Sequence, residues 1–139
     1  MVGKKILMID DDINLVNVVK MVLEARNYQF TSAHSATEGL QKIKEINPDL
    51  IILDVIMEDF VAGFRVVSEL RTGGADSEYS SFSHIPILML TSVTQKTNMS
   101  FSDKVGTALL PVDAFIEKPV KPAHLIEKIE ELIEKGAKT

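Results

Sequence analysis

The sequence contains no cysteine, and this absence removes several kinds of chemistry at once. Disulfides, thiolate catalysis and cysteine-based zinc sites are all excluded. The three histidines, His34, His84 and His124, lack the spacing of metal ligands, so we expect no transition-metal site. No glycine-rich phosphate loop of the Walker kind is present either, which argues against ATP as a phosphodonor.

Long hydrophobic runs and an excess of basic residues are also missing. The first apolar stretch has only about four residues, too few for a signal peptide, and no run reaches membrane-spanning length. We therefore expect a cytoplasmic protein that does not enter the membrane. A net charge of −5 without a basic patch argues against direct contact with nucleic acid. With 139 residues, 45% of them hydrophobic, the chain is expected to form one globular domain over residues 1–139.

Short apolar runs alternate along the chain with stretches of helical periodicity. An uninterrupted run of branched apolar residues indicates a strand buried on both faces of a sheet, and Leu50–Leu53 is the clearest case. About five such alternations favour an α/β fold with a parallel sheet and right-handed crossovers. The expected strands cover residues 5–9, 28–32, 50–54, 85–90 and 114–116.

Capping residues mark the starts of two expected helices. Asp12 precedes a helical pattern, and its carboxylate can accept backbone N–H groups there. Ser35 and Glu38 have the spacing of a capping box. The polar, Gly- and Ser-rich segment 72–84 is instead expected to be a flexible loop, and the atypical segment 94–113 is left open because its periodicity is weak.

Four of the expected strands end in polar residues that suit metal ions and phosphoryl groups. Parallel strands would bring these residues to one edge of the sheet, where ligands bind in open α/β sheets. Three carboxylates there form an oxygen-only site that suits Mg²⁺, and a carboxylate can itself accept a phosphoryl group. A lysine and a hydroxyl beside it would stabilise the charge of that group. The residues are Asp10 and Asp11 after the first strand, Asp54 on the third, Thr91 on the fourth and Lys118 after the fifth.

Each of these residues also has a structural explanation when it is taken alone. An aspartate such as Asp54 often starts a turn, Thr91 is a good strand former, and Lys118 could be a solvated turn residue. Their joint placement at one edge of the sheet is what favours a functional site.

Four stretches, in this order, resemble the signature of the response regulator receiver domain: Ile6–Asp11, Leu50–Asp54, Leu90–Ser92 and Phe115–Pro119. The resemblance extends over essentially the whole chain. It implies a flavodoxin-like, doubly wound sheet of five parallel strands with five helices, in a receiver domain with no effector domain in this chain. It also implies a phosphorylation-activated switch of a two-component or phosphorelay system rather than an enzyme.

The resemblance assigns a role to each acidic residue of the site. Asp54 would accept the phosphoryl group from a histidine kinase or a phosphotransfer protein. Asp11 and Asp54 would coordinate Mg²⁺, Asp10 would act mainly through water, and Ile56 would contribute its backbone carbonyl. Mn²⁺ is an alternative to Mg²⁺ as the cofactor.

The same resemblance assigns roles to the remaining site residues. Thr91 would bind a phosphoryl oxygen, and Lys118 would pair with the phosphoryl group next to a cis bond to Pro119. Phe115 matches the aromatic switch residue; because it lacks the hydroxyl of the commoner tyrosine, it would have to act by packing alone. The output would be a downstream protein partner or a fused effector, and whether phosphorylation drives homodimerisation stays open.

The loop after Asp54 departs from the family pattern. Glu58 stands where the family usually has proline, and the loop to Gly63 is one residue longer. Ile56 and Val93 would flank the phosphoryl group, and neither apolar side chain can position an attacking water. We therefore expect slow self-dephosphorylation.

Two other functions are weighed against the switch. A small Mg²⁺-dependent phosphohydrolase could use Asp54 as its nucleophile, but it usually needs a second carboxylate two residues later, where this chain has Ile56. A receiver that only binds protein is disfavoured because every chemical position is filled. A flavin-binding version of the fold would need a hydroxyl-rich phosphate loop in place of the first aspartates.

Overall fold

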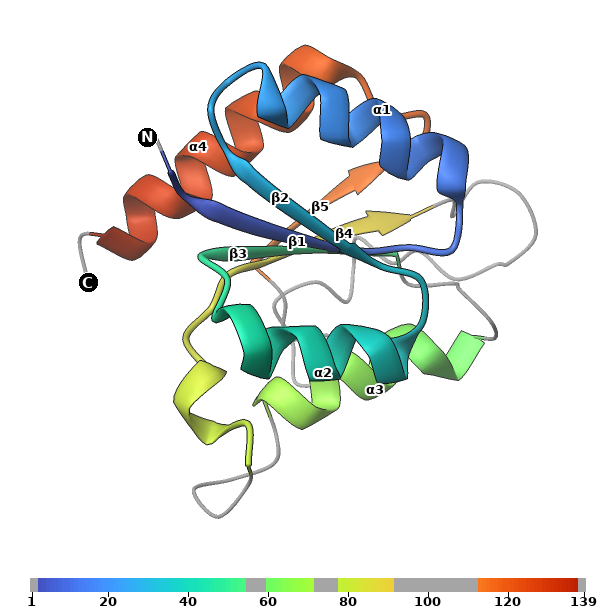
Figure 1. Ribbon diagram of the computed structural model, residues 1–139, viewed down its shortest axis with the longest axis vertical. Coiled ribbons are helices and arrows are strands. Elements are labelled where there is room, and N and C mark those ends of the chain that lie inside the picture. The colour runs from blue at the N-terminus through green and yellow to red at the C-terminus, as the bar shows by residue number, and fades with distance from the viewer. Residues whose placement is uncertain (1–2, 55–59, 72–77, 92–112, 138–139) are drawn as a thin grey trace.

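The computed structural model describes residues 3–54, 60–71, 78–91 and 113–137, with side chains left undescribed at 60–64, 80, 91 and 135–137. Five parallel strands form one sheet in the order β2-β1-β3-β4-β5 (Figure 1). This is the strand order of flavodoxin-like doubly wound folds, so the predicted fold class is confirmed. The strands are β1 (Lys5–Ile9), β2 (Gln29–Ala33), β3 (Leu50–Asp54), β4 (Ile87–Thr91) and β5 (Ala114–Glu117).

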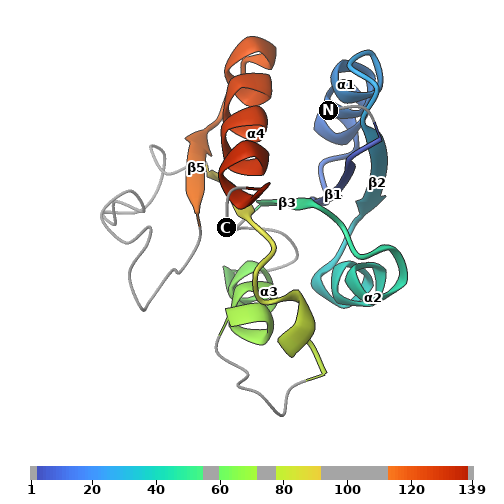
Figure 2. The ribbon, with the colours of Figure 1, turned by 90° about the vertical axis from the view of Figure 1, so that its left-hand side faces the viewer.

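Helices cover both faces of the sheet. Figures 1 and 2 show α1 and α4 on one face and α2 and α3 on the other, which completes a three-layer α/β/α arrangement. None of the helices in the described residues is both long and apolar enough to cross a membrane. The elements are α1 (Ile13–Glu24), α2 (Ala36–Ile46), α3 (Phe60–Arg71), the 3₁₀ helix η1 (Ser80–Phe82) and α4 (Pro122–Ala137).

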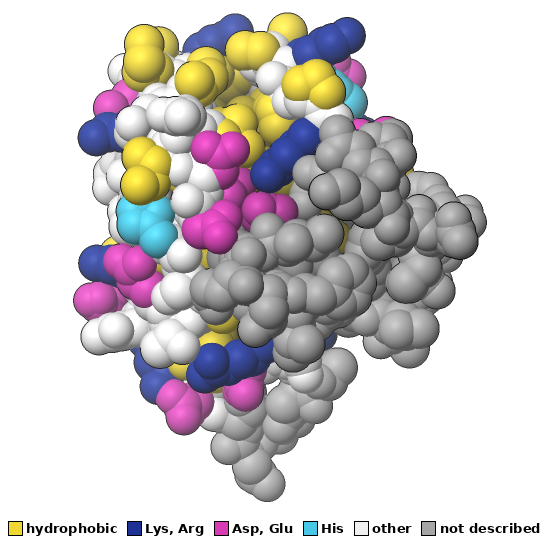
Figure 3. Space-filling model, turned by 90° about the vertical axis from the view of Figure 1, so that its right-hand side faces the viewer, with side chains coloured by type: hydrophobic (Ala, Val, Ile, Leu, Met, Phe, Trp, Pro, Cys, Tyr) yellow, Lys and Arg dark blue, Asp and Glu magenta, His cyan; other side chains and the backbone are white. Residues whose placement is uncertain are grey.

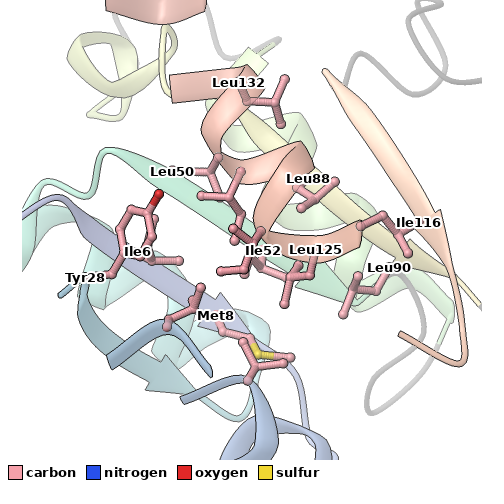
Figure 4. Packing of buried hydrophobic residues seen from close by; sticks show 14 of the residues in the cluster. Ile6, Met8, Tyr28, Leu50, Ile52, Leu88, Leu90, Ile116, Leu125 and Leu132 are labelled. Atoms are coloured by element: carbon pink, nitrogen blue, oxygen red, sulfur yellow. The ribbon is translucent and has the colours of Figure 1, made fainter. Parts of the chain in front are cut away.

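Alternating side chains of the central strands feed two separate cores. Ile52 of β3 points into the core under α1 and α4, which Figure 4 shows from close by, whereas Ile51 points into the core under α2 and α3. All four apolar residues of Leu50–Leu53 have no exposed surface. The prediction of a strand buried on both faces is therefore confirmed, and Asp54 ends a strand that is buried along its whole length.

One expectation falls outside the described residues, and another is corrected by the structure. The described residues contain four α helices, and the fifth expected helix falls in the segment 92–112, which lies outside them. The expected flexible loop 72–84 is wrong for its second half, because η1 begins at Ser80 and the neighbouring Tyr79 is buried against the core. An aromatic side chain on a polar background anchors this connection to the domain.

Candidate functional site

The carboxyl ends of the strands place the predicted site residues at one edge of the sheet. Asp10 directly follows β1, Asp54 is the last residue of β3, and Lys118 directly follows β5. Thr91 ends β4 at the same edge, although its side chain is not described. Ile56, Val93 and the 58–59 pair lie outside the described residues.

Three carboxylates converge at this edge and form an acidic group. One carboxylate oxygen from each of Asp10, Asp11 and Asp54 lies within 4.8 Å of the other two. Asp10 is fully buried and Asp54 is 5% exposed, while Asp11 is open to solvent. Figure 3 shows acidic side chains gathered beside a basic side chain on this face. The group is therefore reachable from solvent on one side and enclosed by the sheet on the other.

Among the described residues, Lys118 supplies the positive charge that pairs with this group. Its Nζ lies 3.3 Å from Oδ2 of Asp54 and 3.6 Å from Oδ2 of Asp10. The side chain reaches the group from the turn after β5, where the bond between Lys118 and Pro119 is cis. One ammonium group thus bridges the two buried carboxylates and offsets part of their repulsion.

The residues of the acidic group fit a divalent cation. Three carboxylates against one ammonium group leave two negative charges uncompensated, which is the charge that Mg²⁺ or Mn²⁺ would balance. Oδ2 of Asp10 is buried and has no hydrogen-bond partner among the described residues. The available metal-ligating atoms are all oxygens. Mg²⁺ is usually bound by a few carboxylates together with water molecules. The cation would be held by Asp10, Asp11 and Asp54.

The turn between β1 and α1 holds the first two carboxylates in place. Asp12 N–H donates a hydrogen bond of 2.9 Å to Oδ1 of Asp10. Oδ1 of Asp12 accepts from Leu15 N–H at 3.2 Å, so Asp12 caps α1 as predicted. The three consecutive aspartates therefore have different tasks: Asp12 starts the helix, whereas Asp10 and Asp11 face the acidic group.

Phe115 lies next to the site on β5 but does not join the acidic group. Its side chain is partly buried and packs against the core under α2 and α3. It pairs in register with Met89 of β4, two residues before Thr91. Phe115 and Met89 therefore belong to the same core under α2 and α3.

Sequence reasoning missed His34, which lies beside the acidic group. Its ring Nδ1 is 3.3 Å from the backbone oxygen of Asp10. No other histidine stands at ligand-like spacing from it in the sequence, so the spacing pattern does not single it out. The parallel register of β1 and β2 brings it there: Ile9 pairs with Ala33, so the residues that directly follow the two strands are Asp10 and His34.

Comparisons with known proteins point to one family. The family described as "Response regulator receiver domain" matches residues 6–130. Over 135 residues the chain is 30% identical to the Transcriptional regulatory protein ResD of Bacillus subtilis, covering 97% of this chain and 50% of that protein. Over 126 residues it is 28% identical to the DNA-binding response regulator MtrA of Mycobacterium tuberculosis, covering 91% and 49% respectively. The chain thus spans about half the length of these curated relatives.

Solved structures give the same picture for the fold. A CheY-like response regulator receiver domain protein from Methanospirillum hungatei is 29% identical, with a TM-score of 0.76 and 98% of both chains covered. The chemotaxis response regulator CheY4 of Vibrio cholerae is 27% identical, with a TM-score of 0.76, covering 94% of this chain and 98% of that one. Both similarities extend over nearly the whole chain.

Proposed function

Because the chain belongs to the response regulator receiver domain family, we propose that it is a phosphorylation-activated switch whose phosphoacceptor is Asp54. The donor is a phosphohistidine on a histidine kinase or on a phosphotransfer protein. The observation that carries the proposal is the placement of the Asp54 carboxylate: it ends the buried strand β3, lies beside Asp10 and Asp11, and is 3.3 Å from Lys118 Nζ.

The transfer step follows from the chemistry of these groups. A carboxylate oxygen of Asp54 attacks the phosphorus atom, the bond from phosphorus to the imidazole nitrogen of the donor breaks, and an aspartyl phosphate forms. Lys118 shifts from pairing with carboxylates to pairing with the phosphoryl oxygens, which carry the charge in the transition state. Mg²⁺, when bound, supplies further charge stabilisation to those oxygens. Asp10 and Asp11 would hold the cation together with Asp54.

The signal leaves the site through β4 and β5. In the proposal the Thr91 hydroxyl binds a phosphoryl oxygen, and the resulting movement of the β4 end alters the packing of Phe115. Phe115 carries no hydroxyl, so packing is the means by which it responds. The outcome is a changed surface for a partner protein, for a fused effector domain or for a second copy of the chain.

The output partner is also a matter of proposal. We propose that residues 1–139 form a single receiver domain and that this domain itself makes no contact with nucleic acid, in line with its net charge of −5. Relatives of about twice the length are named as transcriptional or DNA-binding regulators, which favours a transcriptional output for the system.

The competing function is a Mg²⁺-dependent phosphohydrolase with Asp54 as nucleophile. The same three carboxylates would serve it, but hydrolysis of the intermediate needs a group that activates water. The sequence has Ile56 at the position where such enzymes usually carry their second carboxylate. Receiver domains generally act as switches rather than as enzymes, and we infer the same for this chain.

Phosphorylation by a small donor tests the proposal. The protein is incubated with acetyl phosphate and Mg²⁺, and its intact mass is measured alongside Asp54→Asn and Asp12→Asn. We expect one phosphoryl adduct on the parent and on Asp12→Asn, because Asp12 lies outside the acidic group, and none on Asp54→Asn. Steady release of phosphate without an adduct would support the phosphohydrolase. If neither an adduct nor phosphate release is observed, a receiver that only binds protein is favoured.

A further inference from the structure

The turn between β2 and α2 fixes the backbone of His34. Its N–H donates a hydrogen bond of 2.8 Å to Oε1 of Glu38. Glu38 N–H in turn donates to Oγ of Ser35 at 3.1 Å, so the predicted capping box forms with one change: the glutamate binds the residue before the cap. The exposed imidazole therefore extends from a turn that is held at both its ends.

From this turn, His34 and its neighbour hold both backbone polar groups of Asp10. Asp10 N–H donates to the carbonyl oxygen of Ala33 at 3.0 Å. The carbonyl oxygen of Asp10 lies 3.3 Å from Nδ1 of His34. Since a carbonyl oxygen can only accept, this contact is a hydrogen bond in the tautomer that carries its hydrogen on Nδ1. The end of β1 is thus connected to the end of β2 by one backbone hydrogen bond and one side-chain hydrogen bond.

The two peptide planes that flank Asp11 are each held by a different bond. The plane before Asp11 contains the Asp10 carbonyl and is held by His34. The plane after it contains Asp12 N–H and is held by Oδ1 of Asp10. Asp11 is exposed, so the direction of its carboxylate depends on these planes more than on packing. Loss of either bond would let the carboxylate turn away from Asp10 and Asp54.

We propose that His34 is a positioning residue for the divalent-cation site, acting through the Asp10 carbonyl on Asp11. This inference rests on the proposed Mg²⁺ site. His34 is not itself part of the acidic group, whose members in the described chain are Asp10, Asp11 and Asp54. Its contact with Asp10 restricts the orientations of the Asp11 carboxylate before the cation binds. Less conformational entropy is then lost on binding. Groups that orient metal ligands in this way typically change metal affinity about 10-fold to 100-fold when they are removed.

Mg²⁺ titration of the full chain, followed by backbone amide NMR, tests the inference. His34→Leu keeps a branched side chain but removes the donor, whereas His34→Asn places an amide N–H at the same distance from Cβ as Nδ1. His84→Leu removes another exposed histidine, which precedes β4 at the opposite edge of the sheet, and is the matched control. We expect His34→Leu to raise the Kd for Mg²⁺ roughly 10-fold, and His34→Asn and His84→Leu to leave it near the parent value. In metal-free buffer, only His34→Leu should shift the Asp11 amide signal and speed exchange of the Asp12 amide.

Two results would overturn the role of His34. If His34→Leu binds Mg²⁺ like the parent, the ring does not position the site. If His34→Asn loses as much affinity as His34→Leu, the hydrogen bond to Asp10 is not the cause. Failure of the parent itself to bind Mg²⁺ would instead contradict the proposed function. In that case the metal-free amide signals of Asp11 and Asp12 still decide whether His34 holds this turn.

Discussion

Neutralising Asp10 should make the metal-free protein more stable, although it destroys the cation site. Asp10 is fully buried, and only Lys118 Nζ, 3.6 Å away, opposes its charge among the described contacts of its Oδ2. At an effective dielectric constant of about 20, each repulsion between carboxylates within 4.8 Å costs about 3 kcal/mol, against about 5 kcal/mol of attraction to Lys118. The exposure of Asp11 reduces its share through solvent screening. The two repulsions together exceed the one attraction, and Asp10→Asn keeps an oxygen that can accept from Asp12 N–H. We therefore expect Asp10→Asn to raise the free energy of unfolding of the metal-free protein by about 1–3 kcal/mol.

Urea unfolding with EDTA and with Mg²⁺ measures this effect. Mg²⁺ at a hundred times its Kd should stabilise the parent by about 2.7 kcal/mol, and Asp10→Asn by far less. Asp12→Asn is the matched control: it removes a neighbouring charge outside the acidic group and keeps the cap on α1, because asparagine caps helices as well as aspartate does. Its stability should change by less than about 0.5 kcal/mol in either buffer. Destabilisation of the metal-free protein by Asp10→Asn would refute the reasoning.

Three further predictions concern packing, alkaline stability and the lifetime of the phosphorylated form. A Cβ on Gly39 would lie 2.5 Å from Cδ1 and 2.9 Å from Cγ1 of Ile9, so Gly39→Ala should lower the free energy of unfolding by about 1 kcal/mol despite its better helix propensity. Urea unfolding should show part of this loss recovered by adding Ile9→Val, and no loss at all would contradict the packing argument. Burial, followed by the charge of Glu130, raises the pKa of Tyr28, whose hydroxyl has no hydrogen-bond partner among the described residues. Folding therefore favours the neutral phenol of Tyr28. The contribution of this group to the free energy of unfolding is present below about pH 10 and should be lost as the pH rises through the raised pKa. Tyr28→Phe should be about as stable as the parent at pH 7 and should lose less stability at alkaline pH. If urea unfolding shows the same alkaline loss of stability in both proteins, the role of Tyr28 is contradicted. Finally, Ile56→Asn should shorten the lifetime of the aspartyl phosphate, measured as loss of the adduct mass over time. An unchanged or longer lifetime would disprove the expectation that the apolar side chain of Ile56 slows dephosphorylation.

The fold and the placement of the acidic group could be predicted because both follow from local patterns. An uninterrupted apolar run such as Leu50–Leu53 can satisfy its burial only in the middle of a sheet covered on both faces. Once the strands are parallel, their carboxyl ends lie at one edge, so Asp10, Asp54 and Lys118 come together although they are far apart in sequence.

Contacts that depend on the register of strands or on single long-range side chains could not be predicted. His34 meets the Asp10 carbonyl only because β1 and β2 pair with Ile9 opposite Ala33. Arg71 at the end of α3 binds the backbone oxygen of Ile85 and forms a 2.9 Å ion pair with Asp113 before β5. The polar composition around residue 79 favours a loop, yet η1 forms there, with Tyr79 and Phe82 packed against the core under α2 and α3.

The most direct test of the account is to find which residue carries the phosphoryl group. The protein is phosphorylated with acetyl phosphate and Mg²⁺, reduced with borohydride, which converts an aspartyl phosphate to homoserine, and mapped by peptide mass spectrometry. The account predicts homoserine at position 54 alone, and its loss when Mg²⁺ is removed. Homoserine at Asp10 or Asp11, or a phosphorylated parent with none at position 54, would contradict the assignment of Asp54 as the phosphoacceptor.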